Sequence, residues 1–174
     1  MSKDILTDGA NELKESSAYS EIIDEDTVEF ESIKKKQTYK DSIWKIVHAQ
    51  EVIECENPVI EKSKLKKWFY CEKGNGLELY KVEYIKDNIL CVESYLTKEN
   101  QLIYAIEWEK RNADLSDDDA TWWNCEYVIK EGYVVDYISL GMGKTEGNSF
   151  DIQDIVALWE TRKPDFMKLK SVLY

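Results

Sequence analysis

Three stretches of this chain repeat one pattern: EYIKDNIL at Glu83–Leu90, YLTKENQLI at Tyr95–Ile103 and EYVIKEGYV at Glu126–Val134. In each, an aromatic and an apolar residue lead to Lys, an acidic residue and Asn or Gly, and a new apolar run follows. Short β-prone runs separated by such a polar pair are typical of hairpins. The sequence therefore predicts an antiparallel β-meander.

Extending the pattern outward predicts about six strands, at residues 65–72, 77–86, 89–97, 102–109, 122–130 and 133–140. Six Trp and eleven Tyr favour a β-rich chain, because aromatic side chains fit pleated surfaces. Apolar and charged residues alternate, which indicates one packed and one solvated face and places Glu107 on the solvated one. The packed face is expected to carry Tyr80, Val82, Tyr84, Leu102, Tyr104, Ile106 and Trp108.

Two helices complete the expected fold. Asp151 is suited to cap a helix in which Ile152–Trp159 has helical apolar spacing, with Pro164 as its stop. Weaker helical spacing runs from Asp41 to about Cys55, although that run is also compatible with the start of a strand. The predicted class is α+β: an antiparallel meander with the C-terminal helix packed on one face.

The net charge of −12 is concentrated at the N-terminus. Residues 1–32 contain ten acids and two lysines, and the folded remainder is only mildly acidic. Residues 1–27 are expected to form an acidic flexible arm, and residues 28–174 a single domain. Neither part supplies the basic footprint that a phosphate backbone requires, which argues against nucleic-acid binding.

No apolar stretch approaches the roughly 20 residues that a membrane-spanning helix needs. The Met-Ser-Lys-Asp start lacks the apolar segment of a signal peptide, so a cytoplasmic location is expected. An exported cell-envelope protein that has lost its signal is the alternative. Accordingly, Cys55, Cys71, Cys91 and Cys125 are interpreted as reduced core residues, with two disulfides in an exported form as the other possibility.

Two motif fragments resemble ligand-binding loops. The run from Gly141 to Thr145 ends like a phosphate-binding loop, but Ile138 replaces the first glycine and the next helix begins too late. Residues 114–118 have the first spacings of a calcium loop, which then fails at Asp119 and Cys125. No cofactor and no metal site are predicted.

His48 is the only histidine, and no partner residue for it is identifiable. A small hydrolase using His48 is therefore a minor alternative, and no catalytic residue is assigned. The pair Trp122-Trp123 is more informative, since neighbours in a strand point to opposite faces. One exposed Trp beside Asp117, Asp118 and Asp119 would form an aromatic anchor surrounded by negative charge.

The hairpin units over about residues 66–140 resemble hairpin-repeat families such as MORN-type repeats and small bacterial β-meander proteins. The glycine spacing that defines MORN units is missing, with only Gly132 in a comparable turn, so the resemblance implies no function. The expected function is non-catalytic binding of a basic protein partner through Trp122, Trp123 and Asp117–Asp119. A bacterial immunity or inhibitor protein for a basic toxin is the most concrete form. The exported envelope protein, with a β-sheet binding surface, is the runner-up.

Overall fold

The computed structural model describes residues 25–49, 52–55, 60–63, 66–112 and 121–173. Its strands form one seven-stranded sheet in the order β1-β2-β3-β4-β5-β6-β7, and every neighbouring pair is antiparallel. In chain order the elements are α1 (Glu25–Val47), β1 (Ile60–Ser63), β2 (Lys66–Gly74), β3 (Leu77–Lys86), β4 (Ile89–Lys98), β5 (Gln101–Arg111), β6 (Trp122–Lys130), β7 (Tyr133–Gly141), the 3₁₀ helix η1 (Lys144–Glu146) and α2 (Asp154–Leu173).

The predicted α+β class and its antiparallel meander are confirmed. The six predicted strands correspond to β2–β7, and β1 adds a short strand that the sequence analysis missed. The hairpins form where the polar pairs predicted them, at Asp87-Asn88, Glu99-Asn100 and Glu131-Gly132. All of these turn residues have positive φ angles, which is the backbone that two-residue turns matching the strand twist require.

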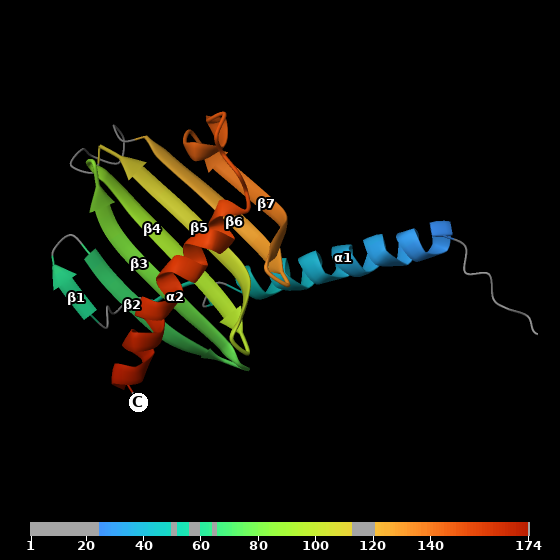
Figure 1. Cartoon of the computed structure of the whole chain (residues 1–174), viewed down its shortest axis with the longest axis horizontal. Coiled ribbons are helices and arrows are strands. Elements are labelled where there is room, and N and C mark those ends of the chain that lie inside the picture. Colours follow the sequence, from blue (N-terminus) through green and yellow to red (C-terminus); the bar gives the residue numbers. More distant parts are fainter. Residues whose placement is uncertain (1–24, 50–51, 56–59, 64–65, 113–120, 174) are drawn as a thin grey trace, which may run out of the picture.

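The sheet has a helix on each face (Figure 1). On the α2 face, Trp159 and Phe166 of α2 pack against the rings of Tyr80 and Tyr95. On the α1 face, Ile43 and the end of α1 pack on a second buried cluster. The helix α1 then continues past the β7 edge, so its N-terminal half projects from the body (Figure 1).

The predicted packed face is right for β3 and wrong for most of β5. Tyr80, Val82 and Tyr84 lie on the α2 face, as does Leu102. The register between β4 and β5 then shifts by one residue: Leu96 pairs with Tyr104, whereas Thr97 pairs with Leu102. The remaining members of the predicted set, Tyr104, Ile106 and Trp108, therefore lie on the α1 face.

The cause of this reversal is Ile103, the extra residue in β5. Ile103 and Tyr104 are consecutive, yet both belong to the buried cluster under α1. A bulge of one residue turns every later side chain of a strand to the other face. As a result Glu107 points toward α2 and is only 7% exposed, contrary to the predicted solvated position.

Both helices differ from their predicted limits. Pro164 does not end α2, which continues to Leu173. A proline inside a helix removes one backbone hydrogen bond, whereas the turns beyond it bury Phe166 and Leu169 almost completely. Asp151 does cap the approach to α2, since its carboxylate accepts the Gln153 N–H at 2.8 Å.

At the other end of the chain, α1 spans Glu25–Val47 rather than 41–55. Its first three residues belong to the segment predicted as a flexible arm. The rest of that arm, residues 1–24, lies outside the described residues, so the arm remains a prediction. Neither described helix is long and apolar enough to cross a membrane.

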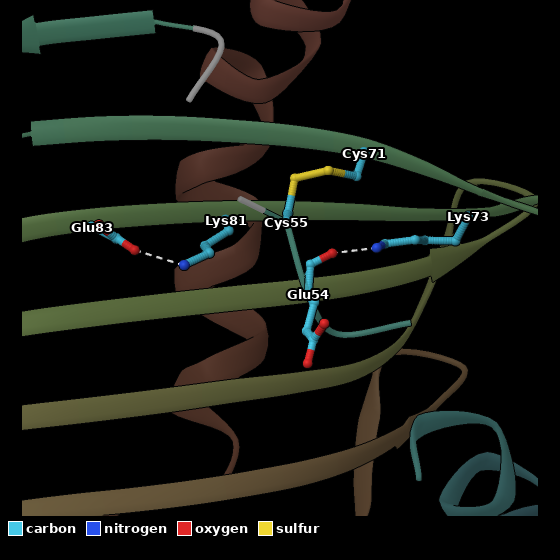
Figure 2. Close-up of a disulfide and its surroundings, with 6 residues drawn as sticks. All are labelled: Glu54, Cys55, Cys71, Lys73, Lys81 and Glu83. Atoms are coloured by element: carbon cyan, nitrogen blue, oxygen red, sulfur yellow. Dashed lines mark hydrogen bonds and ion pairs between the residues drawn. A yellow bond between two sulfur atoms is a disulfide. The ribbon is translucent and has the colours of Figure 1, made fainter. Parts of the chain in front are cut away.

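The cysteines match neither predicted alternative. Cys55 and Cys71 form a disulfide that ties the segment following α1 to β2 (Figure 2). Cys91 and Cys125 are free and buried. The four cysteines differ in the face of the sheet on which they lie. Cys91 and Cys125 point toward α2, and neither lies close to a second cysteine. Cys71 lies on the α1 face, where the segment that follows α1 brings Cys55 next to it.

Candidate functional site

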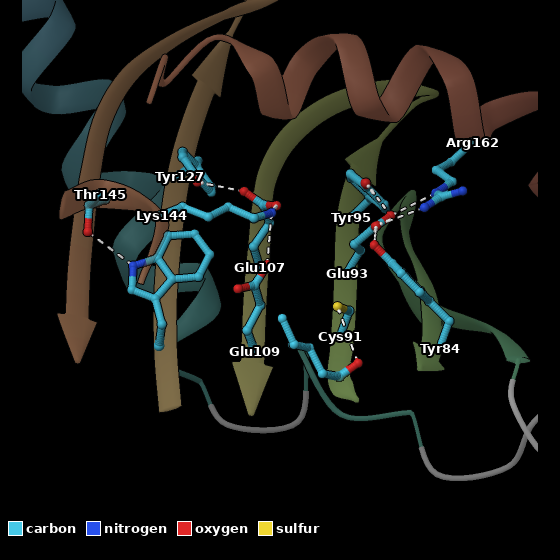
Figure 3. Close-up of polar contacts among 12 residues, drawn as sticks. Tyr84, Cys91, Glu93, Tyr95, Glu107, Glu109, Tyr127, Lys144, Thr145 and Arg162 are labelled. Atoms are coloured by element: carbon cyan, nitrogen blue, oxygen red, sulfur yellow. Dashed lines mark hydrogen bonds and ion pairs between the residues drawn. The ribbon is translucent and has the colours of Figure 1, made fainter. Parts of the chain in front are cut away.

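Two buried carboxylates lie side by side under α2. Glu93 of β4 and Glu107 of β5 are direct cross-strand partners, and both side chains point into the layer between sheet and helix (Figure 3). Like charges placed directly opposite each other destabilise a sheet, and a buried charge is costly unless it is paired. The contacts of each carboxylate therefore show how its charge is compensated.

Glu93 is completely engaged. The guanidinium of Arg162, from α2, donates to its two oxygens at 2.8 and 2.9 Å, and the hydroxyls of Tyr84 and Tyr95 donate at 2.6 and 2.9 Å. Burial by itself would raise the pKa of Glu93, but the hydrogen bonds from Arg162 and Tyr84 outweigh it and hold that pKa below its ordinary value. The hydrogen bonds of Glu93 thus both hold its side chain in place and favour its charged form.

Glu107 is compensated from a different element. Its carboxylate accepts the Tyr127 hydroxyl at 2.8 Å and pairs with the amino group of Lys144, from η1. Lys144 also lies 3.2 Å from Glu109, on the same face of β5. Burial alone would lower the pKa of Lys144, and the two carboxylates raise it above its ordinary value.

The two free thiols of the layer are not activated by these contacts. The pKa of the Cys125 thiol is raised to about 11, mainly by burial, so it is a poor nucleophile near neutral pH. Burial also raises the pKa of the Cys91 thiol. The arrangement connects α2 to the sheet through Arg162 and Glu93, and connects η1 to it through Lys144, which pairs with Glu107 and Glu109.

Trp123 belongs to this same interior. It is 1% exposed, and its indole N–H donates to the hydroxyls of Ser139 at 3.0 Å and Thr145 at 3.1 Å. The segment that resembled part of a phosphate-binding loop therefore closes over Trp123, with Lys144 directed at carboxylates (Figure 3). Trp123, one of the two predicted binding tryptophans, lies in the core.

Trp122 is the exposed member of the pair, as the alternation requires, and 47% of it is accessible. It lies on the α1 face near the end of the sheet, far from the part that α1 covers. Its diagonal neighbours across the strands are Trp108 and Leu140, and its carbonyl accepts the Met142 N–H at 3.1 Å. Together, Trp108, Trp122, Leu140 and Met142 are called the Trp122 patch below.

The Trp122 patch is apolar and open. Leu140 is 51% and Met142 62% exposed, and Trp108 is half-buried. Exposed apolar side chains that adjoin one another are uncommon on a monomeric surface and mark contact sites more often than scattered ones do. Among the described residues, no helix covers this end of the α1 face.

The other predicted site residues are placed less completely. Asp117, Asp118 and Asp119 lie outside the described residues, and the described chain resumes at Thr121, immediately before Trp122. His48 lies just beyond the end of α1 and is exposed, with its ring stacked on Trp44 at a centroid distance of 5.7 Å. The structure brings His48 close to neither Trp122 nor the buried carboxylates.

Sequence analysis missed Leu140 and Met142 as surface residues and Glu93, Glu107, Lys144 and Arg162 as a buried polar set. For the first pair, the alternation of Ile138, Leu140 and Met142 with Ser139 and Gly141 was a signal that the three share one face of the sheet, although not that this face is exposed. The polar set had no comparable signal, since its members are separated in sequence and one depends on the bulge at Ile103. Comparison with known proteins finds no matching family model, no curated relative and no solved structure of significant similarity.

Proposed function

We propose that this protein is a non-catalytic protein-binding module whose contact surface is centred on the Trp122 patch. The observation that supports it is the exposure of Trp122 beside Leu140 and Met142 on a part of the sheet that no described helix covers. Tryptophan is enriched among the residues that dominate binding energy, because it buries a large area with little loss of side-chain freedom.

The way in which β6 is held in the sheet also favours binding through the Trp122 patch. Trp123, adjacent in β6, is locked in the core by two hydroxyls, and the strand around it pairs on both sides. An anchor residue on a fixed strand loses little entropy when it binds. The buried ion pairs, in turn, hold Glu93 and Glu107 in place, which favours a structural role for these two carboxylates.

A basic partner is the more specific form of the proposal. Three aspartates precede Trp122 in the sequence, and the chain outside the acidic N-terminal residues 1–32 is itself mildly acidic. Complementary charge mainly raises the association rate, whereas a desolvated aromatic anchor mainly slows dissociation. An immunity or inhibitor protein for a basic toxin combines these two features, and is the role proposed for this chain.

The test is binding kinetics with a partner captured on the full-length protein and then purified. Trp122→Ala should weaken binding by at least about 2 kcal/mol through faster dissociation. Replacement of Asp117, Asp118 and Asp119 by Asn should instead slow association and reduce its salt dependence.

Val172→Ala is the matched control. Val172 is 73% exposed near the end of α2, so its truncation also removes exposed apolar surface, but away from the patch. Its rates should equal those of the wild type. Equal affinity for wild type and Trp122→Ala would place the interface elsewhere and reject the proposal.

One observation favours a second candidate, an exported envelope protein that binds through its sheet. The disulfide between Cys55 and Cys71 is a type of bond that persists mainly in oxidising compartments. Mass spectrometry of the protein isolated from its native cells tests it. A cleaved N-terminus with the disulfide intact supports export, and an intact Met1 with both thiols reduced contradicts it.

A further inference from the structure

The β7 strand is an edge of the sheet, and its protection is confined to a register shift at Val135 and the segment around it. No described strand lies beyond it, and the sheet order ends there. Natural edge strands are commonly blunted by Lys, Pro or inward charges. The sequence of β7 contains only one charged residue, Asp136, and exposes Tyr133, Tyr137, Ile138 and Leu140.

Two hydrogen bonds show which backbone groups of β7 face outward. The side-chain amide of Gln153 accepts the Val134 N–H at 3.0 Å and donates to the Val134 carbonyl at 3.4 Å, as a neighbouring strand would do. At the other end, the Met142 N–H points inward to the Trp122 carbonyl. Gln153 therefore closes the edge at Val134 only.

The alternation of an antiparallel ladder then assigns the remaining residues. In such a ladder, every second residue of β7 directs its N–H and C=O groups toward β6, as Met142 does opposite Trp122. Leu140 and Ile138 lie two and four residues before Met142 and pair with Asn124 and Glu126, so their backbone groups also point toward β6. Tyr137 and Ser139 consequently direct their N–H and C=O groups away from the sheet. Val135 is the extra residue where the register of β7 shifts, and Gly141 ends the strand, so the open stretch runs from Tyr137 to Ser139.

We propose that this edge pairs with the same edge of a second copy, antiparallel, about a two-fold axis at Ile138. The open stretch from Tyr137 to Ser139 is centred on Ile138, so this register uses the outward groups of both residues. Tyr137 of each copy then exchanges backbone hydrogen bonds with Ser139 of the other. The two sheets become one continuous sheet, which is a self-complementary, closed arrangement.

The side chains fit this register. Ile138 lies opposite its own copy in a non-hydrogen-bonded pair, where side chains approach most closely, and two β-branched residues favour such a site. The single charge, Asp136, is bound by Lys40 at 3.7 Å and by the Trp44 indole at 3.2 Å. It faces Leu140 of the second copy, so no like charges are opposed.

The projecting half of α1 provides an independent reason for a second copy. It extends past the β7 edge (Figure 1), and its residues 31–38 are exposed, including Ile33 at 58%. Helical segments without tertiary contacts are marginal in water. A second copy at the β7 edge would occupy the space toward which this segment points and give it a surface to contact.

This inference bears on the proposed function, because Leu140 belongs to the Trp122 patch and lies opposite Asp136 of the second copy in this register. The two-fold axis is perpendicular to the sheet, so the projecting half of α1 lies on the same face as the Trp122 patch of the second copy. The two proposals are still tested separately. The variant Trp122→Ala is measured by the dissociation rate of a partner protein, and the substitutions at Ile138 by the dissociation constant of the dimer.

The experiment is analytical ultracentrifugation of the full chain over a range of concentrations. Wild type should form a concentration-dependent dimer. Ile138→Lys and Ile138→Asp should each raise the dimer dissociation constant at least about tenfold, because like charges then meet at the axis. An equimolar mixture of the two variants should dimerise again, which also shows that each is folded.

Ile85→Lys is the matched control, since Ile85 is 43% exposed and Ile138 45%. It should dimerise as wild type does. Hydrogen exchange should show concentration-dependent protection of the Tyr137 and Ser139 amides. The proposal would be overturned by any one of three results: a wild type that stays monomeric, a variant Ile138→Lys that dimerises as wild type does, or amide protection that does not depend on protein concentration.

Discussion

Glu93 and Glu107 lie directly opposite each other on neighbouring strands, yet their charges are neutralised by different parts of the chain. Arg162 of α2 binds Glu93, and Lys144 of η1 binds Glu107. Each carboxylate thus fastens one covering segment to the sheet. Separating either carboxylate from its cation would leave a buried charge, so each ion pair stabilises its own covering segment on the sheet.

Removal of Arg162 should be strongly destabilising. In Arg162→Met, Glu93 remains buried without its cation, which typically costs about 3–5 kcal/mol. Urea unfolding followed by fluorescence measures the change. Lys168→Met, an exposed position on the same helix, is the control and should stay within about 0.5 kcal/mol of wild type. A small loss for Arg162→Met would mean that Glu93 takes up a proton or water instead.

Stability should fall at acidic pH because of Glu93. Its pKa is lower in the folded protein than in the unfolded chain, so the unfolded chain binds more protons between the two values. The contribution is fully present above the ordinary carboxyl pKa of about 4.3 and is lost as the pH falls through the folded-state pKa.

Thermal midpoints measured from neutral to acidic pH check this dependence. Glu93→Gln should be less stable at neutral pH but should lose less stability on acidification than wild type does. Glu78, whose pKa is likewise lowered despite burial, by hydrogen bonds from Lys170 and two tyrosines, remains in both proteins and cancels in the comparison. Parallel curves for the two proteins would exclude Glu93 as the titrating group.

A methyl group at Gly143 should disturb Trp123. A Cβ built on Gly143 would lie 2.3 Å from Cγ of the Trp123 ring, and the ring is held by Ser139 and Thr145. Gly143→Ala should therefore cost about 1–3 kcal/mol through overpacking, with a changed near-UV circular dichroism signal. Gly147→Ala, whose nearest contact would be 3.3 Å, should cost less. An equal cost for both would show that the ring moves freely.

The disulfide should contribute to stability. Cys55 and Cys71 are 16 residues apart, and closing a loop of this size contributes about 3 kcal/mol. The double variant Cys55→Ser, Cys71→Ser should lose this amount in urea unfolding. Reductant should lower the stability of wild type similarly and leave the double variant unchanged. Insensitivity of wild type to reductant would contradict the bond.

The hairpins were predictable because their cause is local. Polar pairs such as Asp87-Asn88 and Glu131-Gly132 tolerate positive φ angles, and this backbone both ends one strand and starts the next. Strand order in a meander then follows from the chain order. Alternation also predicted that one of Trp122 and Trp123 is buried, since neighbouring side chains in a strand point to opposite faces.

Which tryptophan is buried depended on the rest of the molecule. The register of β6 against β5 and the closure of the segment containing Thr145 place Trp123 inside and leave Trp122 outside. Alternation along a strand shows only that the two tryptophans lie on opposite faces of the sheet. It does not show which of the two faces is covered at that position.

The sequence by itself determined the α+β class and its hairpins, since turn chemistry and apolar spacing act over a few residues. Only the tertiary structure decided the bulge at Ile103, the burial of Glu107 and the extension of α2 beyond Pro164. Each of these is locally unfavourable. Each is offset by contacts between residues far apart in the chain, such as Lys144 with Glu107 and Phe166 with Tyr80, and these form only when the helices cover the sheet.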